Sequence, residues 1–370
     1  MRATGFEVNL IEKRNRFLRR AFFVCLFLSG AVIAGYLAHT KPAKIVATLA
    51  RINPVFFLLA VLTVIASWAI EGIRVFLIAD ALDERISIWH LIRINMATAF
   101  SGNVVPMASM AAPPTQVFLL HREGIPVGKA TAIVAIRTAA STLFFTISAP
   151  ILFLGFGPSL VRGITKNPAI SAMIQLVLIV SSVVALTTLC ILFRPELGVK
   201  LTNGALSLKF IQKLLGSRSD QIRDRVAKES QAFHESMATL FSRRRDAILV
   251  ACLTLLYWGL YFSLAPLLLL GAGVTMSFYG IVKLVVSLFF AYFIVSYLPI
   301  PSGSGVSEIG FGSILTLLGL PDPTVRTVIL LVWSFLGVQI YTLLGGAFFL
   351  GSLRKRKKSV TASGEKPDRH

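Results

Sequence analysis

Long apolar segments alternate with short polar segments along almost the whole chain. A helix needs about 20 apolar residues to cross the hydrocarbon core of a bilayer. Seven segments reach that length, and they span residues 21–39, 55–79, 130–156, 172–193, 247–270, 277–298 and 327–351. The pattern therefore predicts an all-α fold, in which a polytopic bundle of helices is integral to a membrane.

Two further apolar stretches contain residues that interrupt helices. The stretch 91–120 cannot run as one straight helix, and a re-entrant hairpin fits it better. The stretch 299–320 begins with a loop rich in Pro, Ser and Gly and continues as a short apolar helix from about Glu308. The interruptions expected in the first stretch are Ser101-Gly102-Asn103, Pro106, Pro113 and Pro114.

The composition agrees with a membrane location. Hydrophobic residues make up 55% of the chain and charged residues 15%, and the mean hydropathy is +0.76. The 37 Lys and Arg residues outnumber the 17 Asp and Glu residues, an excess that in a soluble protein suggests nucleic acid. Here the cations lie between apolar segments, where they meet anionic lipid headgroups. We therefore expect no nucleic-acid partner.

The placement of the cations predicts the topology. Of the 37 Lys and Arg residues, 28 fall in segments 1–20, 83–93, 121–129, 194–246 and 352–370, and six fall in the opposite set of connections. This asymmetry places both termini in the cytoplasm of a bacterial cell with the protein in the inner membrane. It requires that stretch 299–320 crosses and that stretch 91–120 returns to its own side, which gives eight crossings plus one re-entrant hairpin.

The same pattern divides the chain into three parts. They are a basic cytoplasmic N-terminus (1–20), a transmembrane domain (21–351) and a basic, disordered cytoplasmic tail (352–370). The loop 194–246 carries apolar residues at helical spacing between Ile222 and Leu240. We expect an amphipathic helix there, which either lies on anionic headgroups or docks a partner protein. No part outside the membrane is large enough to be an enzyme.

The sequence gives little support for a metal site or a nucleotide-binding site. Cys25, Cys190 and Cys252 lie in apolar segments without a C-x-x-C neighbour, and the five histidines are scattered singly. The chain has no G-x-x-x-x-G-K-[ST] motif for ATP. We therefore expect no cofactor.

Charged residues inside apolar segments are the candidates for function, because charge in a bilayer is costly unless it has a partner or a role. Glu71 and Arg74 lie three residues apart on one helix face, so they either neutralise each other or contribute to a site. Arg137 lies about two turns inside its helix and has no acid on its own face. Its partner must come from elsewhere or be a ligand. Lys283 is close enough to the end of its helix to reach the interface.

The loop before Glu308 is the most distinctive polar feature. Its prolines end the preceding helix, and its glycines and serines allow tight turns whose N–H groups can face an anion. Glu308 follows in the first turn of the next helix, where the helix dipole favours a carboxylate. Two interpretations are open: a capping acid in a cytoplasmic turn, or the polar floor of a substrate cavity.

The two broken stretches can be aligned without gaps. Residues 106–115 match residues 299–308, since both segments start with Pro, have Ser at the fourth place and follow an apolar segment. Interrupted helices in separate halves are typical of transporter repeats, with the site where the breaks face each other. The alignment predicts two pseudo-repeated halves with broken helices.

At these residues the chain resembles the flippase-like family that includes the transmembrane region of lysylphosphatidylglycerol synthases. The segment from Pro301 to Glu308 fits the family pattern P-G-G-x-G-x-x-E with Ser302 in place of one Gly, and the resemblance runs from about Ile52 to Leu350. The family's earlier motif, a Pro with a Gly-rich break and a basic loop, is similar to residues 103–124, continuing into 128–130 and Arg137.

One departure from the family concerns the first break. Met110, Ala111 and Ala112 stand where relatives carry Gly-Gly or Gly-Glu, so the resemblance supplies no acid there. Relatives with synthase activity append a soluble aminoacyl-transfer domain, and these 370 residues include no such segment. The resemblance thus implies lipid translocation or lipid binding and does not imply synthesis.

We therefore expect a lipid translocase that moves or binds a polar-headgroup phospholipid or lipid-linked substrate in a cavity between two helical halves. Arg137 is the expected contact for the headgroup phosphate and Glu308 the expected contact for a cation or amine. Glu71 and Arg74 are further candidates. The residues expected to shape the break are Pro301, Ser302, Gly303, Ser304 and Gly305.

Two alternatives remain at the level of the sequence. The protein could be a non-transporting scaffold that presents lipid to a separate synthase or glycosyltransferase docked on loop 194–246. It could also be an intramembrane enzyme, but the sequence shows no convergent nucleophile and base and no metal ligands, so we expect no enzymatic activity.

Overall fold

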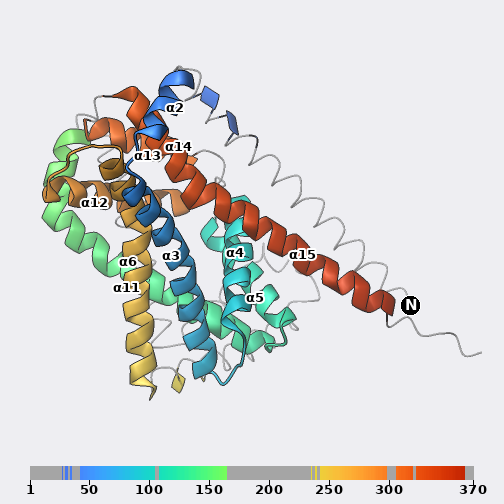
Figure 1. Cartoon of the computed structure of the whole chain (residues 1–370). Helices are drawn as coiled ribbons and strands as arrows, with labels where there is room; N and C mark the ends of the chain where they lie inside the picture. Colours follow the sequence, from blue (N-terminus) through green and yellow to red (C-terminus); the bar gives the residue numbers. More distant parts are fainter. Residues whose placement is uncertain are drawn as a thin grey trace, which may run out of the picture.

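The computed structural model describes residues 42–104, 108–164, 242–297, 306–319 and 322–362, with isolated positions between 27 and 35 and between 235 and 239. Every regular element in these ranges is a helix (Figure 1). The expected segment 172–193 and most of the expected segments 21–39 and 194–246 lie outside the described residues, so the predictions on them stay predictions.

The first half of the described chain contains five helices. The long helix α3 begins at its predicted place because Asn53 caps it: the Asn53 side chain accepts a hydrogen bond of 2.9 Å from the Val55 amide, and Pro54 fills the first helical position. The five helices are α2 (Pro42–Ala50), α3 (Pro54–Ala81), α4 (Ile88–Val104), α5 (Ala108–Arg122) and α6 (Val127–Ile164).

The second half follows the same plan. Its last segment begins at Asp322, whose carboxylate accepts a hydrogen bond of 2.7 Å from the Thr324 amide, with Pro323 at the first helical position. The segment then passes from α14 through the π-helical turn η2 into α15. The elements are α11 (Arg244–Gly271), α12 (Phe278–Tyr297), α13 (Val306–Leu317), α14 (Pro323–Ser334), η2 (Phe335–Gln339) and α15 (Ile340–Ala362).

Four of the described helical segments are long and apolar enough to cross a membrane. Phe278–Phe293 is a shorter apolar helix. All five coincide with segments predicted from the sequence, which confirms a multi-pass helical membrane protein. The four long segments are Pro54–Ala81, Val127–Phe156, Arg244–Gly271 and Pro323–Ser352.

The two halves repeat one arrangement in opposite directions. Helices α3 and α11 have 28 residues each, and each is followed by a six-residue connector, a pair of shorter helices and a long helix. The amide of Asn53 donates to the carbonyl of Gly271 over 2.8 Å, and Arg243 lies 3.3 Å from Asp83. The start of α3 therefore lies beside the end of α11, and the two helices run antiparallel (Figure 1). The predicted pseudo-repeat is confirmed, with inverted topology.

The first broken stretch is a helical hairpin of α4 and α5, which pack against each other. A buried hydrogen bond of 2.7 Å from Gln116 Nε2 to Asn95 Oδ1, both side-chain atoms, joins them. The positions predicted for the break were partly wrong, because Ser101-Gly102-Asn103 lies inside α4 and Pro113-Pro114 lies inside α5. The prolines occupy the sixth and seventh positions of α5, where the loss of two amide donors is tolerated.

The second broken stretch contains the short helix that the sequence predicts, whereas its crossing of the membrane stays a prediction. Helix α12 ends at Tyr297 and α13 begins at Val306, two residues before Glu308. Helices α12 and α13 contact each other and enter from the end of the molecule opposite to the α4–α5 hairpin, as the antiparallel course of α3 and α11 requires. The depth of both hairpins in a membrane stays a prediction.

A close crossing of α4 and α15 joins the two halves. A Cβ atom added to Gly345 would lie 2.0 Å from the Met96 carbonyl oxygen, and one added to Gly346 would lie 3.2 Å from the Phe100 ring. Only residues without a side chain allow the two backbones to approach so closely. This contact fixes the hairpin of the first half against the last helix of the second.

Candidate functional site

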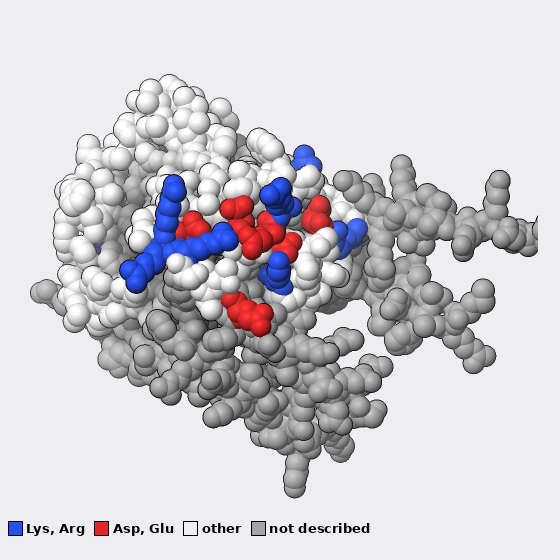
Figure 2. All heavy atoms as spheres, turned by 90° about the horizontal axis from the view of Figure 1, so that it is seen from below, with Lys and Arg blue, Asp and Glu red and all other residues white. Residues whose placement is uncertain are grey.

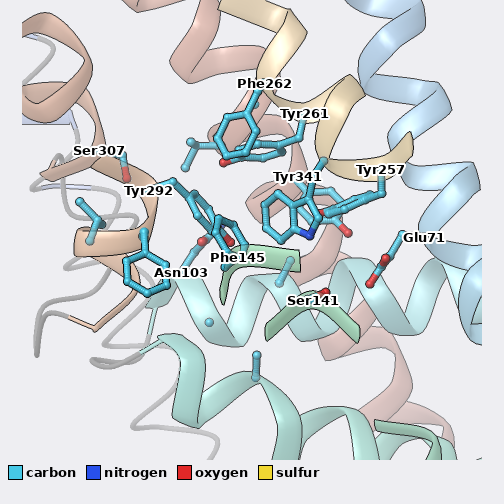
Figure 3. Close-up of a pocket in the computed structure, with 18 of the residues that line it drawn as sticks. Glu71, Asn103, Ser141, Phe145, Tyr257, Tyr261, Phe262, Tyr292, Ser307 and Tyr341 are labelled. Carbon is cyan, nitrogen blue, oxygen red and sulfur yellow. The ribbon is translucent and has the colours of Figure 1, made fainter. Parts of the chain in front are cut away.

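A central cavity of about 330 Å³ lies between the two hairpins. Gly102, Asn103 and Pro113 line it from beside the break of the first hairpin, and Val295 and Ser307 line it from beside the break of the second. Figure 3 shows Asn103 and Ser307 at one side of this cavity and Glu71 at the other. The structure therefore brings the two broken elements to a shared hollow, as the alignment of the two stretches predicts.

The first half supplies a charged wall to the central cavity. Glu71 lies between two guanidinium groups: Arg137 Nη1 is 2.6 Å from Oε1, and Arg74 Nη2 is 2.7 Å from Oε2 and 3.0 Å from Oε1. Arg74 also donates to the hydroxyls of Ser141 and Thr254, each over 3.1 Å. Arg74 is fully buried and bonded on both Nη atoms, so it has a structural role in holding α3, α6 and α11 together.

Arg137 differs from Arg74 in what it leaves accessible. Of the two alternatives for its partner, the structure supports another helix, because Glu71 of α3 binds it. Its side chain is nevertheless 20% exposed, and its Nε has no hydrogen-bond partner among the described residues. Since a guanidinium carries five N–H donors, Arg137 can bind an anion while it stays paired with Glu71.

The charges that line the central cavity do not cancel. Arg74 and Arg137 line it together with one acid, Glu71, and the other described lining residues are uncharged. The described lining residues therefore carry one net positive charge, and they belong to apolar helices. Charge in such surroundings is costly, and an anionic group in the cavity would offset that cost.

The second half supplies an aromatic wall. The rings contact one another, with centroid distances of 5.0 Å between Trp258 and Tyr292 and 5.5 Å between Trp258 and Tyr261, and Figure 3 shows several of them around the cavity. Tyrosine and tryptophan present an apolar face and a polar edge, which suits a pocket for an amphipathic ligand. The wall consists of Tyr257, Trp258, Tyr261, Phe262, Tyr292, Phe293, Phe311, Trp333 and Tyr341.

Sequence reasoning did not identify this wall. One signal was present: Tyr257, Trp258, Tyr261 and Phe262 lie one turn apart in the middle of a predicted span, whereas tyrosine and tryptophan in membrane helices concentrate at the two interfaces. Aromatic residues at mid-span therefore mark a face that contacts protein or a cavity.

Comparison with known proteins identifies the family to which the chain belongs. The family model described as lysylphosphatidylglycerol synthase TM region matches residues 22–345. The chain belongs to this family. The chain is also similar to a UPF0104 membrane protein of Archaeoglobus fulgidus, with 25% identity over 287 residues, which cover 77% of this chain and 83% of that protein.

The family motif ends at Glu308, which the structure places behind the cavity wall. Its side chain is completely buried, which contradicts a capping acid in a solvated turn. Ser334 donates a hydrogen bond of 2.6 Å to Oε1, and the Gln339 amide lies 3.5 Å from the same atom. Its neighbours Ser307 and Gly310 line the cavity. Glu308 therefore holds the cavity-lining part of α13 in place through hydrogen bonds to α14 and η2.

The π-helical turn explains how two residues of one helix reach Glu308. Ser334 and Gln339 are five positions apart, which in an α-helix turns their side chains about 140° away from each other. The i to i+5 bonding of η2 brings them to one face. Such turns occur often at functional sites, and this one lies beside the cavity.

Several predicted site residues lie outside the described residues. They are Pro301, Ser302, Gly303, Ser304 and Gly305, so their role in shaping the second break stays a prediction. The scaffold hypothesis depends on the loop 194–246, of which most also lies outside the described part. A lipid-presenting role toward a synthase or glycosyltransferase therefore stays a prediction.

Proposed function

We propose that this member of the family binds the polar headgroup of a membrane lipid in the central cavity and carries it across the membrane while the acyl chains stay in the bilayer. The observation that supports this most is the unbalanced positive charge of Arg137 beside Glu71, at the meeting point of two inverted hairpins. Transporter repeats place their substrate site at such a meeting point.

The free-energy cost of moving a charged headgroup through hydrocarbon explains why a lipid needs this cavity. A charged headgroup in hydrocarbon loses its water without gaining other partners, which costs far more than a lipid gains from thermal motion. In the cavity Arg137 offers N–H donors to a phosphate, and the hydroxyls of Thr138, Ser141 and Thr142 line the same wall. These groups replace the lost water.

The size of the cavity favours a headgroup over a whole lipid. A volume of about 330 Å³ is at the small end for ligand pockets, so the acyl chains have to remain outside it. The aromatic wall gives an amphipathic lining between the charged wall and the apolar surroundings. We infer that the boundary between headgroup and glycerol lies along these rings.

We further propose that the protein is not an enzyme. Among the described residues, the charged groups that line the cavity are Glu71, Arg74 and Arg137, which we call the Glu71 cluster. Each of them is paired with another member of the cluster. The described lining includes no histidine or cysteine that could serve as a base or nucleophile. This arrangement supports binding and passage of an anion over chemistry on it.

A reconstitution experiment tests the proposal. Native protein, Arg137→Ala and Arg51→Ala are placed in vesicles with fluorescent phosphatidylglycerol, and the exchange of the lipid between leaflets is followed by chemical quenching of the outer leaflet. Arg51 is exposed at the start of α3 and is remote from the cavity, so it is the matched control. We expect native and control to exchange lipid at similar rates and Arg137→Ala to be about tenfold slower. Equal rates in all samples and in empty vesicles would contradict translocation.

A further inference from the structure

A second hollow, which we call the basic pocket, lies on the opposite face of α4 from the central cavity. It has a volume of about 830 Å³ and lies between α4, α5 and α15. Asn95, Thr98 and Gly102 of α4 face the central cavity, whereas Arg93 and Ala97 line the basic pocket. The two hollows share no lining residue, so the basic pocket is a separate site.

The lining of the basic pocket is charged at one end. Arg93 comes from the first turns of α4, Arg122 is the last residue of α5, and Glu123 lies in the turn that follows. Two histidines, His90 and His121, lie beside them. With the histidines neutral, the pocket carries one net positive charge.

This charged end lies on a charged face of the molecule. Figure 2 shows Lys, Arg, Asp and Glu gathered on the end seen from below. Exposed residues on it include Asp83 at the end of α3 and Arg243 at the start of α11, which also form an ion pair. The charge pattern of the sequence assigns this end to the cytoplasm, where anionic headgroups are abundant.

Both guanidinium groups are held in place by aromatic rings. The Arg93 guanidinium lies 5.8 Å from the centre of the Phe348 ring, and that of Arg122 lies 5.8 Å from the centre of the Phe118 ring. Arg122 also donates a hydrogen bond of 2.6 Å to the Ser352 carbonyl. Arg93 is exposed, and no acid or carbonyl is bonded to it within the described residues. The contact with Phe348 orients the Arg93 guanidinium, and its N–H groups remain available to a ligand.

The rest of the pocket is apolar. Ile94 and Ala97 of α4, Leu119 of α5 and Ala347 and Phe348 of α15 continue the lining away from the charged end. A free phosphate ion would contact only the charged end. A molecule with a phosphate at one end and hydrocarbon at the other matches both parts of the lining.

We propose that the basic pocket binds an anionic phospholipid, with its phosphate on Arg93 and its acyl chains along Ala97 and Phe348. The bound lipid fills the angle between the α4–α5 hairpin and α15, beside the close crossing at Gly345. Basic pockets between membrane helices on the cytoplasmic side bind anionic headgroups in this way. The site does not depend on the translocation proposed above.

Native mass spectrometry of the full chain in neutral detergent tests this proposal. Delipidated native protein, Arg93→Ala, Arg93→Lys and Arg51→Ala are titrated with phosphatidylglycerol, and the number and affinity of retained lipids are measured. We expect one binding event to be about tenfold weaker in Arg93→Ala, largely restored in Arg93→Lys and unchanged in Arg51→Ala. Lipid that enters the central cavity contributes equally to every variant, so the difference isolates the basic pocket.

Two further arms decide the chemical class of the ligand. Phosphatidylcholine should show no difference between native protein and Arg93→Ala, because its headgroup carries no net negative charge. Glycerol 3-phosphate should compete only at concentrations far above those of the lipid, because it lacks the acyl chains. Equal lipid binding by native protein and Arg93→Ala, an equal difference with phosphatidylcholine, or equal competition by glycerol 3-phosphate would each overturn the proposal.

Discussion

The two halves of this protein share a frame and differ in chemistry. Both consist of a long helix, a broken hairpin and a second long helix, arranged antiparallel. Among the described residues, the first half gives the central cavity its three charged lining residues and one aromatic ring, that of Phe145. The second half gives it nine aromatic residues and no charge among the described residues. The two halves of an inverted repeat can therefore keep the same helix arrangement while their side chains give the cavity different chemistry.

The same contrast appears in how each half treats its carboxylate. Glu71 of the first half faces two guanidinium groups in the cavity wall. Glu308 of the second half is turned toward Ser334 and Gln339 of its own half. The first acid sets the charge of the cavity, whereas the second fixes the position of the helix that lines it. Substitutions in each half should separate these roles.

The largest effect is expected for Glu71→Ala. It leaves two buried or half-buried guanidinium groups without their shared carboxylate, and loss of one partner from a buried ion pair costs about 3–5 kcal/mol. Thermal unfolding of purified protein in detergent measures this loss. The matched control is Arg243→Ala, which breaks the exposed ion pair with Asp83 and should cost less than about 1 kcal/mol. Equal destabilisation by the two variants would show that the Glu71 cluster does not hold the first half together.

A smaller loss of stability is expected for Glu308→Ala. The substitution leaves the Ser334 hydroxyl without its acceptor in a fully buried site, which costs about 1–3 kcal/mol. Glu308→Gln keeps an oxygen at the same place and should unfold closer to the native temperature. If Glu308→Gln abolished lipid exchange in vesicles without loss of stability, Glu308 would act on the substrate, and the division between the halves would be wrong.

The smallest effect is expected for Tyr261→Leu in the aromatic wall. The variant keeps an apolar side chain and loses ring contacts of about 0.5–1.5 kcal/mol, so lipid exchange should slow by about two- to tenfold. The reduction should be similar for fluorescent phosphatidylglycerol and phosphatidylcholine, whereas Arg137→Ala should slow the anionic lipid more. If Tyr261→Leu changed the ratio of the phosphatidylglycerol rate to the phosphatidylcholine rate, the aromatic wall would discriminate between headgroups by their charge.

Residue pattern predicted the helices well because the thickness of a membrane fixes their length. The prediction for 55–79 differs from α3 by one residue at the start and two at the end, and that for 247–270 differs from α11 by three and one. Caps such as Asn53 and Asp322 are also visible in the sequence, next to the prolines they precede. These signals are local, so no knowledge of the neighbouring helices is needed to read them.

The first break was placed less well because its polar residues find hydrogen-bond partners, one of them within α4 and one on a neighbouring helix. Asn103 donates a hydrogen bond of 2.7 Å to Thr342 of α15, and Ser101 donates to the carbonyl of Thr98 within α4. Their side chains therefore have partners inside a helix, and α4 continues to Val104. Residue types that often break a helix do not break this one, because their side chains are bonded within α4 or to a neighbouring helix.

The sequence by itself determined that the chain is a helical membrane protein with charged residues at Glu71, Arg74, Arg137 and Glu308 inside its apolar segments, because hydropathy and cost of charge depend on composition and spacing. Only the tertiary structure decided what those residues contact. Arg137 reaches a carboxylate 66 positions away, and Glu308 turns toward a π-helical turn that no local pattern predicts. The partners of a buried charge are set by which helices pack together, and that packing is a property of the whole bundle.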